Sequence, residues 1–598
     1  MLNRLFSETN LLLKDINFEH GINIVLGKYS GDKDAKGING IGKSSVIRLI
    51  NYVLLSDTAE KTFNQPKYNF LRDEEHSITL EFTIKNKKHF VKRNFAESDT
   101  VLIGKTPKSF HEYTKQDAII LLGNLFFPVE NTEVVIMGNK YRTLLQFFVK
   151  DDLHNIQRID PLDFFNFPIN ATDKAIYNFY LLNIPTTALW TYADVSKEYK
   201  QYKDTLTGLT SKVLADTGKG IEEFKTEKIK IELKIDQLRE SLKTYNFTIT
   251  HKEIEIKLSE IIGKINDRSQ QYQELSSQLK KIRESYQYNQ DIDTKQIQKI
   301  YNETISHFGN IVAKTIEEIK RFKSELLDNR NKYLLERENE LQKEIDKTFG
   351  DLAKLEQSRS SIFLTLKEKG ALDKIEATYE KLIEEKSLLE KNMQIVLQVD
   401  EIGTILTNTE VALSEIKRDI ITTITSHEKN IQSLRTAFQE ILQTAIFLNE
   451  DAGSGYFGLS PEPNSRKNSL PFKLEVNIPK ADALGQERLK IIAYDLMIFL
   501  MNIQRKRTLP DFLIHDGVFH GIAHDRIVNI LNYVYSKHLK LFAQKHQFQY
   551  IVTFNENEIE TPNGKESTYG EMSFDWKQNV CIQLEDTPNK MLFKRDFK

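Results

Sequence analysis

Residues 189–447 contain no proline, and this long stretch constrains the fold of the chain more than any other feature. Glu, Lys, Gln, Leu and Ile dominate it, a composition that favours long helices. Ten positions within it follow an unbroken four-three spacing with one polar member, which is the period of a coiled-coil seam. These positions are Ile254, Leu258, Ile261, Ile265, Arg268, Tyr272, Leu275, Leu279, Ile282 and Tyr286.

Three further runs keep the same four-three spacing. The first is Leu334, Glu338, Leu341, Ile345, Thr348, Leu352, Leu355, Arg359, Ile362 and Leu366; the second is Ile375, Tyr379, Leu382, Lys386, Leu389, Met393 and Val396; the third is Phe224, Lys228, Ile231, Ile235, Leu238, Leu242 and Tyr245. A shift of phase near 245–250 and a break at 367–374 predict joints between helices.

Seam-bearing stretches flank a middle segment, so we expect one helix to run outward and another to return antiparallel to it, with a tip near residues 287–312. At ~1.5 Å per residue, an outward stretch over 221–286 would reach about 100 Å. A compact helical bundle is the alternative. It would need Gly, Pro or Asn pairs about every 15 to 25 residues, and these are mostly missing.

The segment "GINGIGKSS", residues 37–45, is the second strong constraint. Gly37, Gly42, Lys43 and Ser44 fit a P-loop, in which backbone N–H groups surround phosphates, the lysine reaches the outer phosphates and the hydroxyl binds magnesium. The apolar run "GINIVLG" before it and the helical spacing of "SVIRLINYVLL" after it supply the strand and helix that this motif requires. A glycine-rich turn before a helix is the alternative.

Bulk composition excludes several classes of protein. At 598 residues the chain should form several domains. Lys plus Arg (83) nearly equals Asp plus Glu (85), so any DNA contact needs a local patch such as "KNKKHFVKR" or "NIQRKR", for which ordinary exposed charge is the alternative.

The single cysteine, Cys581, excludes an intramolecular disulfide and fits a reducing cytoplasm. No apolar run reaches about 18 residues and no signal peptide is evident, so we expect a soluble cytoplasmic protein without a membrane partner.

Two globular lobes flank the helical middle. The first mixes helices with strand-like runs, "GINIVLG", "HSITLEFTI", "KHFVKRNF" and "NTEVVIMG", as expected of a nucleotide-binding lobe. In the second, "FKLEVNIP", "FQYIVTF" and "NVCIQLED" read as strands and "ERLKIIAYDLMIFLMNI" as a helix. The sequence thus predicts three domains, 1–188, 189–447 and 448–598.

Apolar residues ending in an acid, "DFLIHD" (511–516), predict a buried strand that delivers Asp516 to a magnesium shell. A P-loop does not hold the metal alone, and an acid at a strand end normally completes the site. An ordinary strand followed by a turn is the alternative.

Together these features resemble the SMC-type ABC ATPases, a group that includes double-strand-break repair ATPases and ATPase subunits of bacterial defence systems. The short arm and the closing lobe, with "ERLKIIAYDLMIFL" before "LIHDGVF" and "YIVTFNENEI" after it, look most like the uncharacterised C-terminal domain typical of bacterial three-component ABC systems, which include Lamassu-type anti-phage defence. The resemblance covers the whole chain. It implies an α/β split ABC-type ATPase head, built from the N- and C-terminal lobes, with a long intramolecular antiparallel coiled-coil arm.

The resemblance assigns roles to individual residues, with ATP and Mg²⁺ as ligands. Ser44, Asp516 and Gln146 of "TLLQFFV" would contact the metal, with a surface glutamine as the alternative for Gln146. The start of "DALGQERLK" lies where a signature helix would face the γ-phosphate bound by a second subunit, although Ala483 replaces the usual serine and a plain helix start is the alternative. The implied nucleotide-binding residues are Gly37, Asn39, Gly40, Ile41, Gly42, Lys43, Ser44, Ser45, Gly485, Gln486 and Arg488.

The chain departs from the family pattern at two places. Related heads have a glutamate directly after the strand aspartate, where it orients the attacking water, but here that position is Gly517. Hydrolysis would then be slow or would use another residue; His520 is the candidate, with His524 and Asp525 nearby and solvated loop residues as the alternative. The switch histidine expected after the last core strand is also missing. Asn555 lies nearby, and it can hydrogen-bond a phosphate but cannot take up its proton.

The resemblance implies a homodimer in which two heads sandwich two ATP molecules and the arms clamp double-stranded DNA, at ends or unusual structures. No nuclease or other effector site is evident, so a nuclease-like effector subunit and a small accessory subunit are the expected partners. The leading interpretation is an ATPase that senses or clamps DNA and controls this effector in anti-phage or anti-plasmid defence. The alternatives are a DNA-repair ATPase that loads a nuclease and an ATP-binding scaffold with little hydrolysis.

Overall fold

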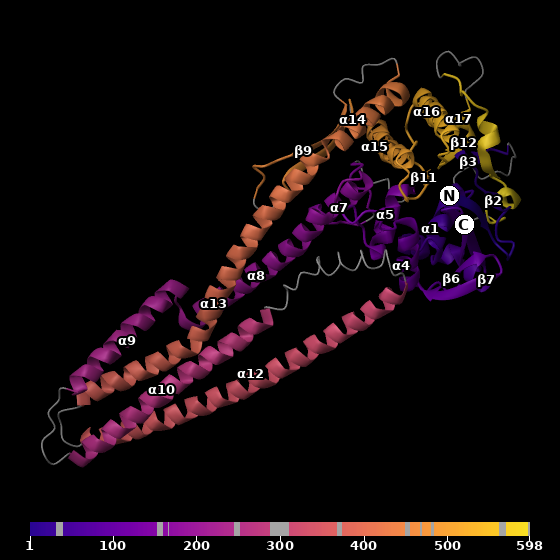
Figure 1. Cartoon of the computed structure of the whole chain (residues 1–598). Coiled ribbons are helices and arrows are strands. Elements are labelled where there is room, and N and C mark those ends of the chain that lie inside the picture. Colours follow the sequence, from indigo (N-terminus) through magenta and orange to yellow (C-terminus); the bar gives the residue numbers. More distant parts are fainter. Residues whose placement is uncertain are drawn as a thin grey trace. The chain divides into compact units, whose positions relative to one another are not determined.

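The computed structural model describes residues 1–30, 40–151, 160–165, 167–243, 252–287, 310–367, 373–448, 455–466, 469–479, 484–560 and 570–595. Several predicted features lie outside these residues, namely Gly37, Asn39, Ala483 and the joint at 245–250. Most of the joint at 367–374 and most of the tip at 287–312 also lie outside them. The chain divides into two compact units, one of residues 1–203 with 404–598 and one of residues 204–403. The described strands belong to the first unit (Figure 1). The domain limits drawn from composition remain predictions.

A five-stranded parallel sheet joins strands from both ends of the sequence. Its order is β13 (Val580–Glu585), β3 (Gly21–Lys28), β12 (Gln549–Asn555), β11 (Phe512–His515) and β8 (Val149–Lys150). Strands β3 and β12 lie side by side, with Gln549 opposite Gly21 and Asn555 opposite Gly27 (Figure 1). The strands predicted from "GINIVLG", "DFLIHD", "FQYIVTF" and "NVCIQLED" are confirmed. Because the carboxyl ends of parallel strands meet at one edge, β3, β11 and β12 deliver their following residues to the same place.

An antiparallel sheet forms the second layer of the first unit. Its order is β2 (Ile16–Asn17), β1 (Leu2–Phe6), β4 (Ser77–Ile84), β5 (Lys87–Asn94), β6 (Thr100–Thr106) and β7 (Ser109–Thr114). A hairpin of β9 (Tyr456–Pro461) and β10 (Phe472–Asn477) stands apart from both sheets. The predicted strands "HSITLEFTI", "KHFVKRNF" and "FKLEVNIP" correspond to β4, β5 and β10 and are confirmed.

Helices complete the first unit. Those that lie wholly within it are α1 (Lys43–Val53), α2 (Asp57–Phe63), α3 (Phe70–Asp73), α4 (Lys115–Phe126), α5 (Tyr141–Phe148), α7 (Ala171–Leu181), α14 (Glu428–Ile441), α15 (Leu484–Gln504), α16 (His524–Ala543) and α17 (Glu556–Ile559). Helices α8 (Thr187–Thr217) and α13 (Asp373–Ser426) belong partly to each unit. Helices α1 and α15 are the ones predicted after the P-loop and before Asp516.

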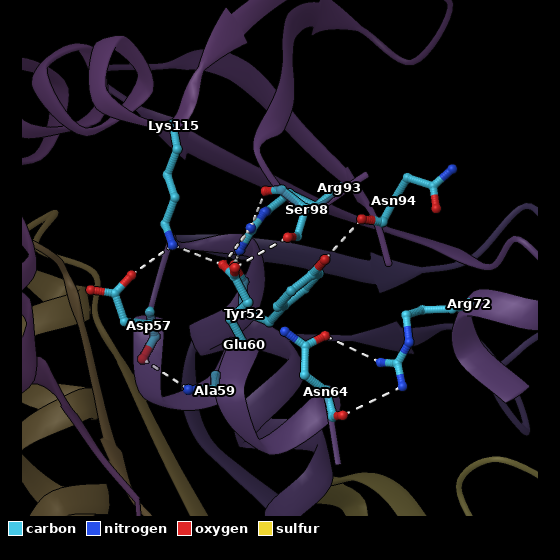
Figure 2. Close-up of polar contacts among 11 residues, drawn as sticks. Tyr52, Asp57, Ala59, Glu60, Asn64, Arg72, Arg93, Asn94, Ser98 and Lys115 are labelled. Atoms are coloured by element: carbon cyan, nitrogen blue, oxygen red, sulfur yellow. Dashed lines mark hydrogen bonds and ion pairs between the residues drawn. The ribbon is translucent and has the colours of Figure 1, made fainter. Parts of the chain in front are cut away.

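Arg93 on β5 is fully buried and ties the antiparallel sheet to neighbouring helices (Figure 2). Its guanidinium donates to the backbone oxygen of Tyr52 at 2.7 Å, to Glu60 Oε2 at 2.8 Å and to the carbonyl of Ser98. Lys115 donates to the same Glu60 oxygen at 2.8 Å. Burial alone would raise the pKa of Glu60, but the hydrogen bonds from Arg93 and Lys115 outweigh it and lower the pKa. Since Tyr52 lies near the end of α1, this network holds the far end of the P-loop helix.

The strand predicted at "NTEVVIMG" (131–138) is wrong, because this segment is irregular until a short 3₁₀ turn begins at Gly138. Thr186, just before α8, supplies the hydrogen bonds that a neighbouring strand would otherwise make to this segment. Its N–H donates to the oxygen of Glu133 at 2.8 Å, and its hydroxyl donates to the oxygen of Val135 at 2.9 Å and accepts from the nitrogen of Val135 at 3.0 Å. The polar backbone groups are therefore satisfied without sheet pairing.

In the second unit, α10 (Lys252–Gln287) and α12 (Asn310–Lys367) pair antiparallel. Tyr272 faces Phe349, with ring centroids 6.3 Å apart, and Arg283 donates to Glu338 at 2.8 Å. Partner numbers fall as residue numbers rise, so the helices run in opposite directions. Predicted seam positions form the buried cluster between them, which consists of Leu275, Leu279, Leu341 and Ile345.

The single outward stretch predicted over 221–286 is wrong. Lys225 on α9 (Ile221–Lys243) lies 2.8 Å from Asp400, and Lys280 on α10 lies 3.6 Å from Glu401, the next residue of α13. One straight helix would separate Lys225 from Lys280 by about 80 Å. The chain therefore reverses direction between α9 and α10. The heptad spacing defined which face of each helix is buried, but a shift of phase does not reveal whether the chain bends slightly or turns back.

Across the described residues, every helix is too short or too polar to cross a membrane.

Candidate functional site

Gly42 closes the P-loop and caps α1 in a left-handed conformation, with φ of 106°. A Cβ at this position would lie 2.5 Å from the Cβ of Leu592, so both the backbone angle and the close approach require glycine. Leu592 also donates its N–H to the oxygen of Ile41 at 3.1 Å. A segment from the opposite end of the sequence therefore braces the loop directly.

A pocket of about 400 Å³ opens at the carboxyl edge of the parallel sheet. It is lined by the P-loop, by residues that follow β11 and by residues at the end of β12 or just after it, and we call it the P-loop pocket. The residues discussed below that line it are Gly40, Ile41, Gly42, Lys43, Ser44, Ser45, Asp516, Gly517, His520, Thr553, Asn555 and Glu558. Every predicted P-loop residue in the described part of the chain thus meets Asp516 and His520 in one cavity, while their roles remain predictions.

Lys43 begins α1 and points across the pocket, where its Nζ donates to Asn555 Oδ1 at 2.6 Å. Burial lowers the pKa of Lys43, and the carboxylates of Glu558 and Asp516 oppose this shift. The amine is thus partly removed from water without a directly bonded carboxylate. A half-buried cation beside the N-terminus of a helix suits an anionic ligand such as phosphate.

Asp516 is 2 % exposed and is held by two neighbouring strands. The hydroxyl of Thr553 on β12 donates to Asp516 Oδ1 at 2.6 Å, and the N–H of Asp516 donates to the oxygen of Lys150 on β8 at 2.8 Å. The N–H of Gly517 reaches the same Thr553 hydroxyl at 3.3 Å. Thr553 therefore orients both the acid and the residue that follows it.

The donor set of this pocket fits magnesium. Among the described residues, no group of three or more His, Cys, Asp or Glu side chains could hold a metal ion alone. Mg²⁺ does not need such a group, since it usually binds one or two protein ligands together with phosphate and water oxygens. The Ser44 hydroxyl and the Asp516 carboxylate line the same cavity and supply oxygens of this kind.

Glu558 and His520 form a pair at the mouth of the pocket. Glu558 Oε2 accepts from the N–H of Asn555 at 2.7 Å, and Oε1 lies 3.2 Å from Nδ1 of His520. The His520 side chain is 70 % exposed, so water reaches its ring. A histidine whose Nδ1–H is held by a carboxylate presents Nε2 as a proton acceptor, the arrangement that orients a general base.

A buried charge cluster lies beneath Asp516. The Lys150 ammonium contacts Asp495 of α15, and His515 Nε2 lies 3.0 Å from the same carboxylate. The other ring nitrogen of His515 lies 2.9 Å from the hydroxyl of Tyr550 on β12. Burial lowers the pKa of both Lys150 and His515, with Asp495 acting in the opposite direction. The cluster joins β8, β11, β12 and α15 at the residue directly before Asp516.

Several predicted residues do not line the P-loop pocket. Gln146 on α5 is 8 % exposed, and its amide donates to the oxygen of Arg142 at 3.4 Å. His524 Nδ1 lies 3.0 Å from the oxygen of Glu558, and neither His524 nor Asp525 is part of the lining.

The three signature-like residues on α15 also lie outside the lining, and two of them contact the loop after Asp516. A Cβ on Gly485 would lie 2.7 Å from the oxygen of Gly521, and Arg488 donates to the carbonyl of His520. The buried amide oxygen of Gln486 has no hydrogen-bond partner among the described residues. Their role toward a second subunit stays a prediction.

Sequence reasoning missed Thr553 and Glu558. Thr553 sits inside an apolar strand and gave no local signal. Glu558 follows Asn555 at capping-box spacing, and both reciprocal hydrogen bonds are present at the start of α17. That spacing could have been read from "FNENE".

Comparisons with known proteins give limited matches. The family described as "Uncharacterised protein conserved in bacteria" (DUF2326) matches residues 441–597, which nearly coincide with the predicted closing lobe at 448–598. No curated protein matches the chain.

Two solved structures align with the chain at low similarity. One is the Smc head domain with a coiled coil and joint from Pyrococcus yayanosii, at 12% identity and a TM-score of 0.33, covering 92% of each chain. Another is the Smc head domain with an extended coiled coil from Pyrococcus furiosus, bound to the C-terminal domain of ScpA; it has 10% identity and a TM-score of 0.32, and covers 94% of this chain and 90% of its own.

Proposed function

We propose that this protein is an ATPase with a split, SMC-type ABC head, in which both ends of the chain form one nucleotide site. The observation that carries this proposal is that Lys43 and Ser44 of the P-loop line the same cavity as Asp516. Lys43 bonds the outer phosphates of ATP, as P-loop lysines do. Ser44 and Asp516 hold Mg²⁺, which when bound neutralises charge on the phosphates.

Hydrolysis in this proposal uses the pair formed by His520 and Glu558 in place of the glutamate missing at Gly517. The oxygen of a water forms a bond to the γ-phosphorus while the bond from this phosphorus to the β–γ bridging oxygen breaks. One proton of the water passes to Nε2 of His520, and ADP and inorganic phosphate leave. Glu558 holds Nδ1 and stabilises the resulting imidazolium. Because His520 is largely exposed, a second head that covers it would exclude bulk water and complete the site.

Dimerisation follows from the same proposal. Gly485, Gln486 and Arg488 face the γ-phosphate held by a second copy, so ATP favours the closed homodimer through its differential contacts. Closure moves the coiled-coil arms and clamps double-stranded DNA. A nuclease-like effector and a small accessory subunit act with this clamp in cytoplasmic anti-phage or anti-plasmid defence.

One observation favours a second function, an ATP-binding scaffold with little turnover. Gly517 brings no side chain into the pocket, and its N–H is already engaged by Thr553. In such a protein ATP binding alone would switch the dimer, and hydrolysis would only reset it slowly.

Nucleotide binding and turnover test the proposal and separate the two functions. The full chain should bind a fluorescent ATP analogue with Mg²⁺ and release phosphate, and Lys43→Ala should lose both. Lys61→Ala, which removes an exposed lysine of the same lobe, should retain both. Binding without phosphate release above the Lys43→Ala background, with and without duplex DNA, would leave only the scaffold. If the wild-type chain bound no nucleotide, both proposed functions would be refuted.

A further inference from the structure

A second pocket, of about 320 Å³, lies at the opposite edge of the parallel sheet from the P-loop pocket. Asp511, directly before β11, and Gln547, just before β12, line it, whereas Asp516 follows β11 and Asn555 ends β12. Strand β12 has seven residues and so separates the two edges by roughly 20 Å. A ligand here would not compete with a nucleotide.

Lysines from three separate elements converge on this second pocket. Lys85 comes from the turn between β4 and β5, Lys506 from the end of α15 and Lys545 from the end of α16. All three are exposed, and none makes an ion pair or side-chain hydrogen bond with the described residues. Lys85 belongs to the basic stretch "KNKKHFVKR" and Lys506 to "NIQRKR", so folding brings together two stretches that are far apart in the sequence.

The other charged groups of the pocket are already engaged. Arg507 donates to the oxygen of Tyr180 at 2.7 Å, and His546 Nδ1 lies 3.0 Å from the oxygen of Ile503. The carboxylate of Asp511 contacts the terminal amino group of Met1. The three lysines therefore supply the cationic side chains of this pocket that are free to meet a ligand.

Each of these lysines occupies a left-handed backbone position, with φ of 49° at Lys85, 57° at Lys506 and 62° at Lys545. Glycine or asparagine adopts this conformation at lower cost. Lys506 and Lys545 each take the place in a Schellman motif where glycine is usual, as the bonds from Lys506 to Ile503 and from Lys545 to Phe542 indicate. A helix dipole favours lysine at these two ends, but it does not explain Lys85, which lies in a β-turn. The three lysines therefore stand where glycine or asparagine would fit the backbone at lower cost.

Positive charge extends beyond the pocket along the antiparallel sheet. Lys87 at the start of β5 and Lys105 on β6 are also exposed. Burial lowers the pKa of His89, and the charges of Lys105 and Lys87 lower it further. A surface of this extent suits a long polyanion better than a single phosphate group.

We propose that Lys85, Lys506 and Lys545 bind the phosphate backbone of duplex DNA at this pocket, which we call the basic pocket. The choice of DNA as ligand rests on the proposed function, but the site is separate from the nucleotide pocket. Lysine contacts to phosphates confer affinity without reading sequence, so binding here is independent of base composition and sensitive to salt.

A triple variant, Lys85→Asn with Lys506→Gly and Lys545→Gly, tests this site in the full chain. Asparagine and glycine tolerate left-handed backbone, so Tm should stay the same or rise. Affinity for a fluorescent linear duplex should fall at least about tenfold, and the slope of log K against log salt should become shallower by about 2.7, at about 0.9 per phosphate contact. A control triple variant, Lys14→Gln, Lys61→Gln and Lys429→Gln, removes equal charge from exposed positions outside the pocket and should bind DNA like the wild type.

Each outcome separates this inference from the proposed ATPase. If the first triple variant keeps the DNA affinity and the salt slope of the wild type, the basic pocket would be refuted, and the proposal of ATP binding would be unaffected. Failure of the wild type to bind duplex DNA, or binding of polyglutamate instead, would overturn the basic pocket as well. If the wild-type chain binds DNA but no nucleotide, and the triple variant loses the DNA binding, the basic pocket would be supported and the proposed ATPase would be refuted.

Discussion

The Lys43 ammonium donates a 2.6 Å hydrogen bond to the side-chain oxygen of Asn555, joining the P-loop to the end of β12. The bond crosses the cavity that Asp516 also lines. Asn555 is therefore the group that Lys43 contacts before any ligand arrives. An anion that enters the pocket competes for the same amine and can replace this neutral partner with a charged one.

We expect Lys43→Met to abolish the rise in Tm that ATP and Mg²⁺ cause, without lowering the Tm of the ligand-free protein. Burial already opposes the charge of Lys43, so its removal relieves a cost in the empty pocket while eliminating ligand binding. Thermal unfolding with and without nucleotide measures both effects. Lys61→Met is the control, and a nucleotide shift that persists in Lys43→Met would refute the assignment.

Glu558→Gln should reduce phosphate release while nucleotide affinity stays unchanged. Glutamine preserves the hydrogen bond to the N–H of Asn555 but removes the charge that supports an imidazolium at His520. His520→Ala should lower the turnover further, within the range of about 10² to 10⁴ typical of a lost general base. Single-turnover phosphate release measures this step.

Glu560→Gln is the matched control, since Glu560 is exposed and does not line the pocket. Equal turnover in Glu558→Gln and in the wild type would rule out the pair as the hydrolytic group.

Asp495→Asn should destabilise the first unit by about 3–5 kcal/mol, because it leaves the buried Lys150 charge without a counterion. Urea unfolding followed by far-UV circular dichroism measures the change. Asp419→Asn, at an exposed position of α13, should change stability little. A near-neutral effect of Asp495→Asn would mean that Lys150 is neutral in the folded protein.

The same cluster predicts an acid-sensitive stability. Burial lowers the pKa of His515 in the folded chain below its unfolded value of about 6.5, so the unfolded state binds the proton more readily. Stability associated with His515 is therefore present above this pH and is lost as the pH falls through it, by up to about 1.4 kcal/mol per pH unit. His515→Gln should flatten the stability profile between pH 7 and pH 5 measured by urea unfolding. An unchanged slope would contradict the shift.

Reversal of the chain between α9 and α10 can be measured as a distance. Lys225 and Lys280 contact adjacent residues of α13, so spin labels at these two positions should lie far closer than the about 80 Å expected of a straight helix. Double electron–electron resonance on Lys225→Cys with Lys280→Cys, in a Cys581→Ser background, measures this separation. A distance near that of a straight helix would restore the single outward stretch.

Much of the fold could be predicted where the signal is local. The P-loop follows a strand and precedes a helix, and the "DFLIHD" segment forms β11 before Asp516, because each pattern is local: the first lies within residues 21–55 and the second within 511–516. The buried leucines and isoleucines of α10 and α12 were likewise evident, since a four-three spacing places them on one helix face whatever the partner is.

Only the tertiary structure decided which distant residues meet. Thr553 contacts Asp516, Lys150 contacts Asp495, and Glu558 contacts His520. These pairs form because parallel strands bring their ends to one edge of the sheet, in an order that no local pattern encodes. The failed strand at 131–138 and the reversal after α9 have the same cause. Periodicity records which side of a segment is buried, whereas hydrogen-bond partners and chain direction depend on long-range contacts that form only when the whole chain packs.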